Sequence, residues 1–349
     1  MHNFLMAAAA CVVGSNSGGA QREALHLLSC DTETGSAAMV ETLTNLQGTT
    51  YCALSPDRTK LYSVCAKADA RRASYVIEVP YSSSGFGEPR RIAELPCEAP
   101  CHIALSPDGS RLAFAAYVSA TAGTVSLADG AVTSVVHADD LKGPDAKRQE
   151  KAHAHCVFFT PDGSRVGVVD LGLDRIFFYD PATMRRDDSM TIVSSPGYGP
   201  RHAIFSKDGK FLFVLHELGN FVSSYAFRDG RFAHVSTLST LPEGCKEWSK
   251  AAAIKLTDDG SILMASNRGV DSIAFFSVNV ASGALTMRNV AMLGGKFPRD
   301  FQLMPGERFM VVGHKMSDEI QVYRFDREAC TLAPAGAPLA CWRPLYFSF

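Results

Sequence analysis

Short apolar runs flank a turn rich in Pro, Asp and Gly at six places along the chain. The unit at residues 103–114, "IALSPDGSRLAF", shows the pattern; the residues that open the turns stand at positions 55, 106, 160, 206, 257 and 304. An Asp-Gly turn after an apolar run is a strong hairpin signal, because glycine accepts the positive φ that such turns need. Each unit therefore predicts two antiparallel strands, and we expect its turn aspartate to be structural and to bond the following backbone amides.

A third apolar run follows each hairpin, and a weaker fourth run precedes the next unit. Examples of the third are "DRIFFYD" at 174–180 and "DEIQVYRF" at 318–325, and examples of the fourth are "AVTSVVH" at 131–137 and "LTMRNVAML" at 285–293. Helical periodicity is scarce. Four short strands that repeat about every fifty residues are typical of a β-propeller blade, so the chain is predicted to be all-β with four-stranded antiparallel blades.

The spacing of the units predicts seven blades. The turns are 46 to 54 residues apart, so 349 residues have room for seven units although six turns are visible. We expect residues 4–13, 23–30 and 38–44 to supply three strands of the last blade, and the C-terminal "CWRPLYFSF" to supply the fourth. Such closure removes an exposed sheet edge. Residues 1–349 would then form a single propeller domain; the alternative is a six-bladed ring with extra segments.

Composition and charge narrow the class of protein. Hydrophobic residues make up 46% and charged residues 20%, with a net charge of -2, so we expect neither a nucleic-acid partner nor a membrane partner. The run "FLMAAAACVV" at 4–13 is too short to span a bilayer, and it is expected to be a buried strand rather than a signal segment. Ten cysteines without a secretory signal favour free thiols and a cytoplasmic protein.

Polar side chains gather at one end of the predicted blades. The first strand of each blade starts, and the second ends, at the same rim, so residues just before one and just after the other should ring the mouth of the channel. Six of the ten histidines fall in this set, which a functional site explains well. The set is Cys101, His102, His153, His155, Arg201, His202, Arg299 and Asp300 before first strands, and Tyr117, Asp170, His216, Glu217, Asn267, Arg268, His314 and Lys315 after second strands.

These segments also carry a family resemblance. The stretches "HAHCVFFTPDG", "GYGPRHAIFSKDGKFLFVLHELGN", "LMASNRGVDSIAFFSV" and "GGKFPRDFQLMPGERFMVVGHKMSDEIQVYRF" resemble the seven-bladed lactonase family that includes cycloisomerase-type 6-phosphogluconolactonase and carboxymuconate cyclase. The likeness covers nearly the whole chain and is weakest over residues 1–50. It implies an active site at His155, Arg201, Glu217 and Arg268.

Opening a lactone requires activation of a water, stabilisation of the carbonyl oxygen and protonation of the leaving oxygen. Glu217 is the leading candidate for the base, although an ion pair with Arg201 that only ties blades together remains the alternative. His155 is expected to be its partner as base or acid, or otherwise a hydrogen-bonding group at the strand start. Arg201 and Arg268 are assigned to the oxyanion or to an anionic substrate group. Further substrate-binding candidates are His102, His153, Asp170, His202, Arg299, His314 and Lys315.

Two other features bear on the chemistry. His153, His155 and Glu217 form a tolerable metal-ligand set, but neighbouring arginines would repel a dication, so we expect no metal and no other cofactor. The polar connection at 137–155 enters the rim before the two histidines. It is either a tolerated insertion or a partial lid over the mouth, and we favour the lid.

The sequence thus predicts a lactonase that hydrolyses an anionic sugar-acid lactone, most specifically 6-phosphogluconolactone, by attack of an activated water. The alternative within enzymes is a carboxymuconate-type cyclase or another small-lactone hydrolase. The rival from another class is a non-catalytic propeller that serves as a protein-interaction platform, since propellers host many functions. A platform would expose aromatic and leucine side chains at the rim.

Overall fold

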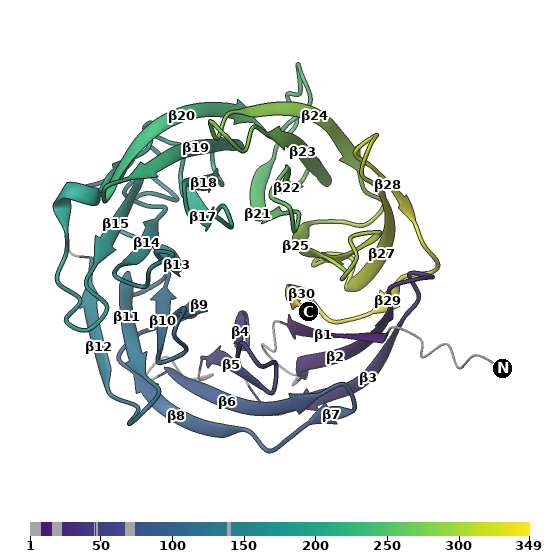
Figure 1. The fold of residues 1–349 in the computed structure, drawn as a ribbon, viewed down its shortest axis with the longest axis horizontal. Helices are drawn as coiled ribbons and strands as arrows, with labels where there is room; N and C mark the ends of the chain where they lie inside the picture. Colours follow the sequence, from purple (N-terminus) through teal and green to yellow (C-terminus); the bar gives the residue numbers. More distant parts are fainter. Residues whose placement is uncertain (1–7, 16–22, 45, 47, 67–73, 138–140) are drawn as a thin grey trace.

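The chain folds into a ring of seven antiparallel sheets, as Figure 1 shows for the computed structural model. The structure describes residues 8–15, 23–44, 46, 48–66, 74–137 and 141–349. The prediction of a seven-bladed, all-β propeller is confirmed, and the six-bladed alternative is wrong. All ten cysteines are free thiols, as expected. The part of the chain described here contains no helix long and apolar enough to cross a membrane.

The blades follow one another around the ring in chain order. Blade 1 contains β4 (Cys52–Leu54), β5 (Lys60–Cys65), β6 (Ser74–Ser82), β7 (Gly85–Phe86) and β8 (Arg90–Leu95). Blade 2 contains β9 (Pro100–Leu105), β10 (Arg111–Ala116), β11 (Thr121–Ser126) and β12 (Val132–Val136). Blade 3 contains β13 (Ala154–Phe159), β14 (Val166–Asp170), β15 (Arg175–Tyr179) and β16 (Ile192–Val193), with the short 3-10 helix η1 (Asp188–Met190) before β16.

The remaining blades complete the circle. Blade 4 contains β17 (Pro200–Phe205), β18 (Phe211–His216), β19 (Phe221–Arg228) and β20 (Arg231–Ser239). Blade 5 contains β21 (Lys250–Leu256), β22 (Ile262–Arg268), β23 (Ser272–Val278) and β24 (Leu285–Met292). Blade 6 contains β25 (Pro298–Leu303), β26 (Phe309–His314), β27 (Glu319–Asp326), β28 (Thr331–Pro334) and β29 (Leu339–Ala340). Blade 7 contains β1 (Ala8–Ser15), β2 (Glu23–Asp31), β3 (Ala37–Thr44) and β30 (Pro344–Ser348).

The hairpin turns repeat one side-chain arrangement. The Ser106 hydroxyl donates to Asp108 at 2.6 Å and accepts the backbone N–H of Arg111 at 2.9 Å, while Gly109 takes a φ of +71°. The same hydroxyl–aspartate contact recurs in the turns that open at 55, 160, 206 and 257. Bonds from the Ser106 hydroxyl and from Ser110 lower the pKa of Asp108 to about 2. The turn aspartates are therefore structural, as the sequence predicts.

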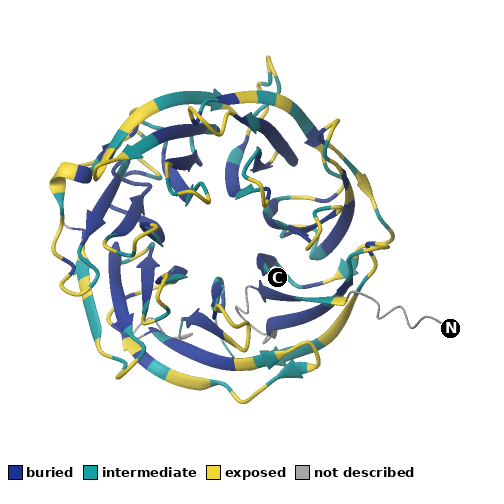
Figure 2. Cartoon of the chain, in the orientation of Figure 1, coloured by how far each residue is buried: buried dark blue, intermediate teal, exposed yellow. Residues whose placement is uncertain are grey.

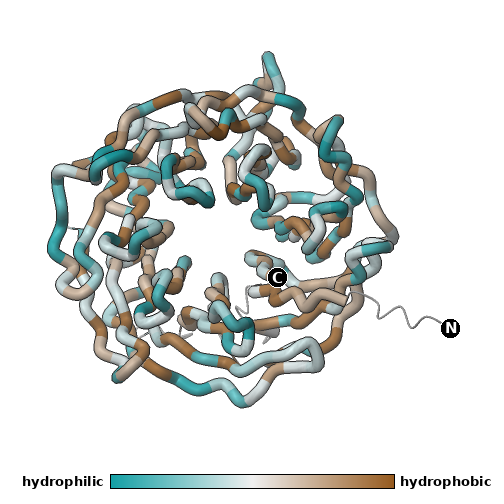
Figure 3. The backbone as a smooth tube through the Cα atoms, viewed as in Figure 1, coloured by the Kyte–Doolittle hydropathy of each residue, from teal (hydrophilic) through white to brown (hydrophobic). Residues whose placement is uncertain are grey.

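Apolar side chains fill the space between neighbouring blades. Between blades 2 and 3, the small Ala113 and Ala115 share one buried cluster with Val157, Val168 and Phe177. Figure 2 shows that the inner and middle strands are buried and that exposed residues gather on the outermost strands and loops. The loops are correspondingly the more hydrophilic parts of the chain in Figure 3. Close packing of this kind fixes each blade against the next.

Blade 7 joins the two ends of the chain. Its strand order is β3-β2-β1-β30, so the C-terminal strand lies innermost and pairs antiparallel with β1, with Val13 opposite Phe347. The predicted segments 23–30, 38–44 and 341–349 are confirmed as strands of this blade. Of the predicted first strand at 4–13, the residues from Ala8 onward are confirmed, and 4–7 lie outside the described residues.

We expect Phe347→Ala to destabilise the ring strongly. Phe347 is 1% exposed and packs in a core cluster shared by blades 6 and 7, so its truncation leaves a cavity at the closure. The expected loss is about 3–5 kcal/mol of unfolding free energy, measured by guanidinium denaturation. Phe349→Ala, at a half-buried residue two positions along the chain, is the control and should cost less than half as much. Equal losses in the two variants would contradict the importance of the closure contact.

Candidate functional site

A cavity of about 600 Å³ opens at the mouth of the ring. It lies where inner strands begin and second strands end, which is the end of the ring that the sequence predicts to carry the polar rim. The residues that line it come from blades 1 to 6 and from the connections between them. They are Gly48, Thr50, Ala66, Ala99, Pro100, Cys101, Tyr117, Val118, Arg148, His155, Glu217, Trp248, Lys250, Arg268, Phe297 and Arg299.

A single carboxylate, Glu217, stands among three arginines on one wall of the cavity. Its Oε1 lies 2.7 Å from Arg148 Nη2, and its Oε2 lies 3.0 Å from Arg268 Nη2. Arg201 Nε is 3.2 Å from Oε2 as an ion pair that lacks hydrogen-bond alignment. Glu217 is only 2% exposed. The predicted ion pair with Arg201 is present, and Arg148 and Arg268 join it.

The three arginines are held in different ways. Arg268, at the end of β22, donates from Nε to the carbonyl of Lys250 at 3.1 Å and from Nη2 to that of Ala251 at 2.7 Å. Arg201, on β17, donates to the carbonyl of Ala252 and to His202 Nε2. Both are therefore fixed to the backbone of blade 5. Arg148 lies instead on the connection between blades 2 and 3, and donates to the Tyr117 hydroxyl at 3.3 Å.

The electrostatics of the site keep Glu217 ionised. Burial raises the pKa of the carboxyl, but the positive charges of Arg268, Arg201 and Arg148 outweigh burial and hold the pKa well below its ordinary value. Burial lowers the pKa of Arg268 to about 10, opposed by the attraction of Glu217 and reinforced by the repulsion of Arg201. A buried carboxylate with more than one cationic neighbour is fully compensated, so it needs no proton to remain inside the protein.

Positive charge exceeds negative charge at the cavity. Within the described residues, neither Arg299 nor Lys250 nor the nearby Lys315 forms an ion pair with a carboxylate at 4.0 Å or closer. Burial, together with the repulsion of Arg201 and Arg268, lowers the pKa of Arg299 to about 9. Burial and the charge of Arg299 likewise lower the pKa of Lys315 to about 8. A cavity with this surplus is suited to an anionic ligand.

His155 is the histidine that lines the cavity. Its ring lies 5.7 Å from the Tyr117 ring and 5.5 Å from the His202 ring, centroid to centroid. Burial, followed by the charge of Arg201, lowers the pKa of His155 well below its ordinary value, so the imidazole is neutral. Its Nδ1 is buried and has no hydrogen-bond partner among the described residues. A neutral imidazole presents one donor and one acceptor nitrogen.

His102 and His202 lie behind the lining residues, with their rings 5.4 Å apart. His102 Nδ1 accepts the backbone N–H of Val157, and its ring packs 3.9 Å from that of Tyr51. His202 accepts a hydrogen bond from Arg201. Both residues are buried and neither lines the cavity, so the structure gives them contacts that support the site. Their proposed contact with substrate stays a prediction.

Three further predicted substrate-binding residues are not brought to the cavity. Asp170 accepts from the backbone N–H of His153 at 2.8 Å and pairs with His137 Nδ1 at 2.8 Å. His153 stacks under the Tyr117 ring at 4.2 Å and contacts Glu150, so it supports a lining residue. His314 is fully buried and contacts the Tyr323 hydroxyl. All three follow the rim rule in sequence, but Asp170 and His314 turn into the blades and His153 lies behind Tyr117.

The sequence analysis missed several residues that line the cavity. Trp248 and Lys250 stand just before or at the start of the inner strand β21, where the rim rule should have found them. Gly269, with a φ of +103°, leaves room for the Trp248 ring, because a Cβ there would meet it at 2.5 Å. Arg148 comes from the connection at 137–155, which was expected to be a partial lid, and residues 138–140 of that prediction lie outside the described residues. No pattern singled out Arg148 within it.

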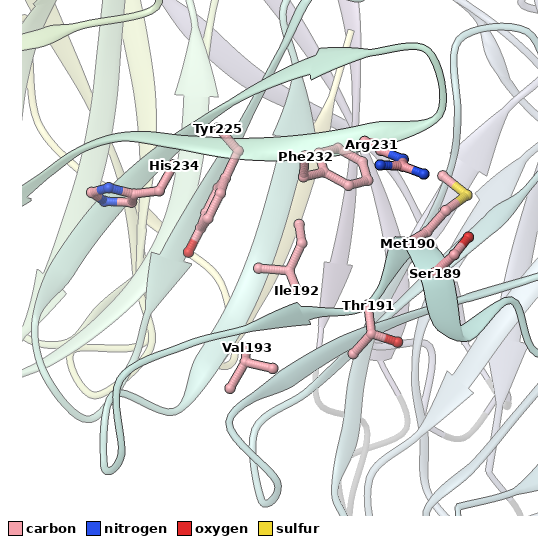
Figure 4. A pocket seen from close by; sticks show the side chains of 9 residues that line it. All are labelled: Ser189, Met190, Thr191, Ile192, Val193, Tyr225, Arg231, Phe232 and His234. Atoms are coloured by element: carbon pink, nitrogen blue, oxygen red, sulfur yellow. The ribbon is translucent and has the colours of Figure 1, made fainter.

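Neither a metal site nor a charged site at a second cavity is supported by the described residues. In the described ranges, no group of three His, Cys, Asp or Glu side chains is placed to hold a metal ion. A second cavity, of about 430 Å³, lies at the perimeter between β16 and β20. Figure 4 shows that its basic side chains, Arg231 and His234, lie at opposite ends of it. The convergence of charge is therefore a property of the mouth cavity.

The fold and this cavity define a β-propeller whose mouth cavity is rich in positive charge. Comparison with known proteins identifies its family. The family model "Lactonase, 7-bladed beta-propeller" matches residues 10–349, so the chain belongs to the seven-bladed β-propeller lactonase family. A protein of Bacillus subtilis named 6-phosphogluconolactonase is 31% identical over 322 residues, which cover 90% of this chain and 91% of the relative.

Solved structures agree with this assignment. The periplasmic gluconolactonase PpgL of Pseudomonas aeruginosa superposes with a TM-score of 0.87 and 26% identity, over 98% of this chain and 99% of that one. A protein from Lactobacillus plantarum superposes with a TM-score of 0.87 and 27% identity, over 97% and 98% of the two chains.

We expect Asp170→Asn to weaken the fold and leave the site intact. The substitution removes the charge that His137 and two backbone amides face in a buried position, which should cost about 1.5–3 kcal/mol of unfolding free energy. The dissociation constant for an anionic probe at the mouth, 6-phosphogluconate, should change less than about 3-fold. Unchanged stability with lost binding would place Asp170 at the ligand after all.

Acid should destabilise the protein through its buried histidines. Burial lowers the pKa of His102 and His216 to about 3, and that of His314 to about 4. The unfolded chain binds protons at these groups below pH ~6.5 and the folded chain does not, so stability falls as the pH drops through that value. Between pH 7.5 and 5 the loss is about 2 kcal/mol for each histidine.

Guanidinium unfolding at pH 7.5 and pH 5 measures this loss. His314→Gln removes one of the titrating groups, so the difference between the two pH values should be smaller in the variant than in the wild type. An identical difference in both proteins would show that His314 does not contribute to the acid sensitivity.

Proposed function

We propose that the protein is a lactonase that opens an anionic lactone, most specifically 6-phosphogluconolactone, in the mouth cavity. The observation that carries the proposal is the meeting of one ionised carboxylate, one neutral imidazole and several cations in a cavity of about 600 Å³. Membership of the lactonase family and the name of the B. subtilis relative support the reaction class and this substrate.

The residues match the steps of lactone hydrolysis. The oxygen of water attacks the carbonyl carbon while Glu217 accepts the proton of the water, and the ring C–O bond then breaks as the ring oxygen gains a proton. His155, with one donor and one acceptor nitrogen, relays that proton to the leaving oxygen. Arg268 is fixed by two backbone carbonyls, so its remaining N–H groups are preorganised for the carbonyl oxygen as it gains charge.

The other cations account for the charge of the substrate. Arg299 and Lys250 line the cavity without a carboxylate partner among the residues described, and Lys315 adds a third positive charge nearby. A phosphate or carboxylate on the lactone supplies the missing negative charge. Arg201 lies behind Glu217 and fixes its orientation from the adjacent strand.

A second candidate substrate is a small carboxylated lactone with few hydroxyl groups. The cavity presents Ala66, Val118, Trp248 and Phe297 on its walls, and its neutral hydroxyl groups are those of Thr50 and Tyr117. Such a lining offers few partners for a polyhydroxylated ring, and it favours an apolar ring that carries one anionic group. The protein-interaction platform has weaker support: Trp248 is exposed at the rim, but the charged groups converge inside the cavity.

Hydrolysis assays at pH 7.5 test the function. 6-Phosphogluconolactone, glucono-1,5-lactone and a carboxymuconolactone are followed by pH-stat titration, with the spontaneous rate subtracted. We expect the phosphorylated lactone to be opened fastest, and Glu217→Gln to lower kcat by about 10²–10⁴-fold. A fold that is intact by circular dichroism is required for the comparison.

Glu94→Gln makes the same chemical change on the outer strand β8, at an exposed side chain that pairs with Arg91, and should retain wild-type rates. A wild-type protein that accelerates none of the three lactones would refute the proposal. Preference for the carboxylated lactone would support the second candidate.

A further inference from the structure

Arg148 differs from the other two arginines that contact Glu217. Its side chain is 27% exposed, whereas those of Arg201 and Arg268 are 3% and 5% exposed. It lies on a connection between blades, and no backbone carbonyl among the described residues accepts a hydrogen bond from its guanidinium. Of the three, Arg148 is therefore the one whose guanidinium is held by side chains and not by the backbone.

The backbone that carries Arg148 is fixed, so movement would be confined to the side chain. Asp145 Oδ1 accepts the backbone N–H groups of Lys147 and Arg148 at 2.9 and 3.2 Å. The next residue, Gln149, is fully buried and donates from its side chain to the carbonyl of Leu171 at 2.9 Å. Arg148 thus projects from an anchored turn into the cavity.

The guanidinium has donors to spare. Arginine carries five N–H donors in a planar fork. Of these, Arg148 uses Nη2 toward Glu217 Oε1 and the Tyr117 hydroxyl, and its Nε and Nη1 have no partner among the described residues. Both bidentate edges of a guanidinium include Nη2, paired with either Nε or Nη1, so bidentate binding of a phosphate or carboxylate by Arg148 requires Nη2 to leave Glu217.

The two oxygens of Glu217 are also unequal. Arg201 and Arg268 both contact Oε2, and Arg148 is the cation that contacts Oε1. A guanidinium on Oε1 occupies that oxygen and weakens it as a proton acceptor. Among the described residues, neither Arg299 nor Lys250 nor Lys315 pairs with Glu217 within 4.0 Å, so Arg148 is the lining cation in contact with Oε1.

We propose that Arg148 binds the anionic group of the lactone and releases Oε1 of Glu217 when it does so. Arg148 is then a specificity-determining residue, because an anionic lactone draws it away from the base and a neutral lactone does not. This inference rests on the proposed function. It assigns the discrimination between charged and neutral lactones to the connection between blades 2 and 3.

Kinetics with two lactones of different charge test this. In Arg148→Met, KM for 6-phosphogluconolactone should rise about 10–100-fold, the effect of losing a charge-assisted bidentate contact. For neutral glucono-1,5-lactone, kcat should instead rise several-fold, because Oε1 is no longer occupied. In Arg148→Lys, KM for the phosphorylated lactone should lie between those of the wild type and Arg148→Met, because lysine keeps a single positive charge.

The opposite effects on the two substrates separate this role from a structural one. A fall in kcat for both lactones, or no change for either, would overturn the proposal. The control is Lys147→Met, which removes a neighbouring positive charge from the same turn and should leave both sets of constants unchanged. Thermal unfolding of each variant verifies that the turn is still anchored.

A binding measurement distinguishes failure of this proposal from failure of the proposed function. The chain contains two tryptophans, so Trp342→Phe leaves Trp248, in the cavity wall, as the fluorescent reporter. In that background, 6-phosphogluconate should bind about 10–100-fold more weakly when Arg148→Met is added. Binding that depends on Arg148 in a protein that opens no lactone would refute the function and retain the anion contact. If the protein opens lactones but Arg148→Met binds 6-phosphogluconate as tightly as its parent, the role of Arg148 is refuted and the proposed function is retained.

Discussion

The pairing of β30 with β1 is the constraint on which the remaining structure depends. Thr50 in the connection before blade 1 and Arg299 in blade 6 line the same cavity, with blade 7 between them. Blade 7 exists as a four-stranded sheet because strands from both ends of the chain combine in it. The backbone amide of Phe347 in turn donates to Asp300, beside Arg299, so closure also fixes the inner strand of blade 6. A ring left open at this point would have no defined mouth.

Within the closed ring, the site is organised around a buried negative charge. An isolated carboxylate in such a position would take up a proton, but three guanidinium groups keep Glu217 ionised. Three guanidinium groups around one carboxylate leave a net positive charge even before Arg299, Lys250 and Lys315 are counted. A field of this sign attracts anionic molecules from solution.

Sequence periodicity was sufficient to predict the fold and the end of the ring that holds the site. The hairpin turns, the blade count and the shared blade 7 all follow from local patterns, because each depends on turn chemistry and strand alternation. Rim position also predicted the place of His155, Glu217, Arg268 and Arg299, which line the mouth cavity. It could not tell which rim side chains point into the cavity, since Asp170 and His314 obey the same rule and turn into the blades. Arg148 was not predictable, because the path of its connection depends on Gln149 and Asp145 rather than on any repeat.

The order of the strands in blade 7 has a consequence for biosynthesis. β30 begins at Pro344, so the ribosome has already released the six other innermost strands when this strand emerges. Until then β1 presents an unpaired edge to the cell, and nascent chains are open to association through that edge. Blades 1 to 6 can form as the chain grows, but the two sides of the cavity reach their final separation only after β30 has paired with β1.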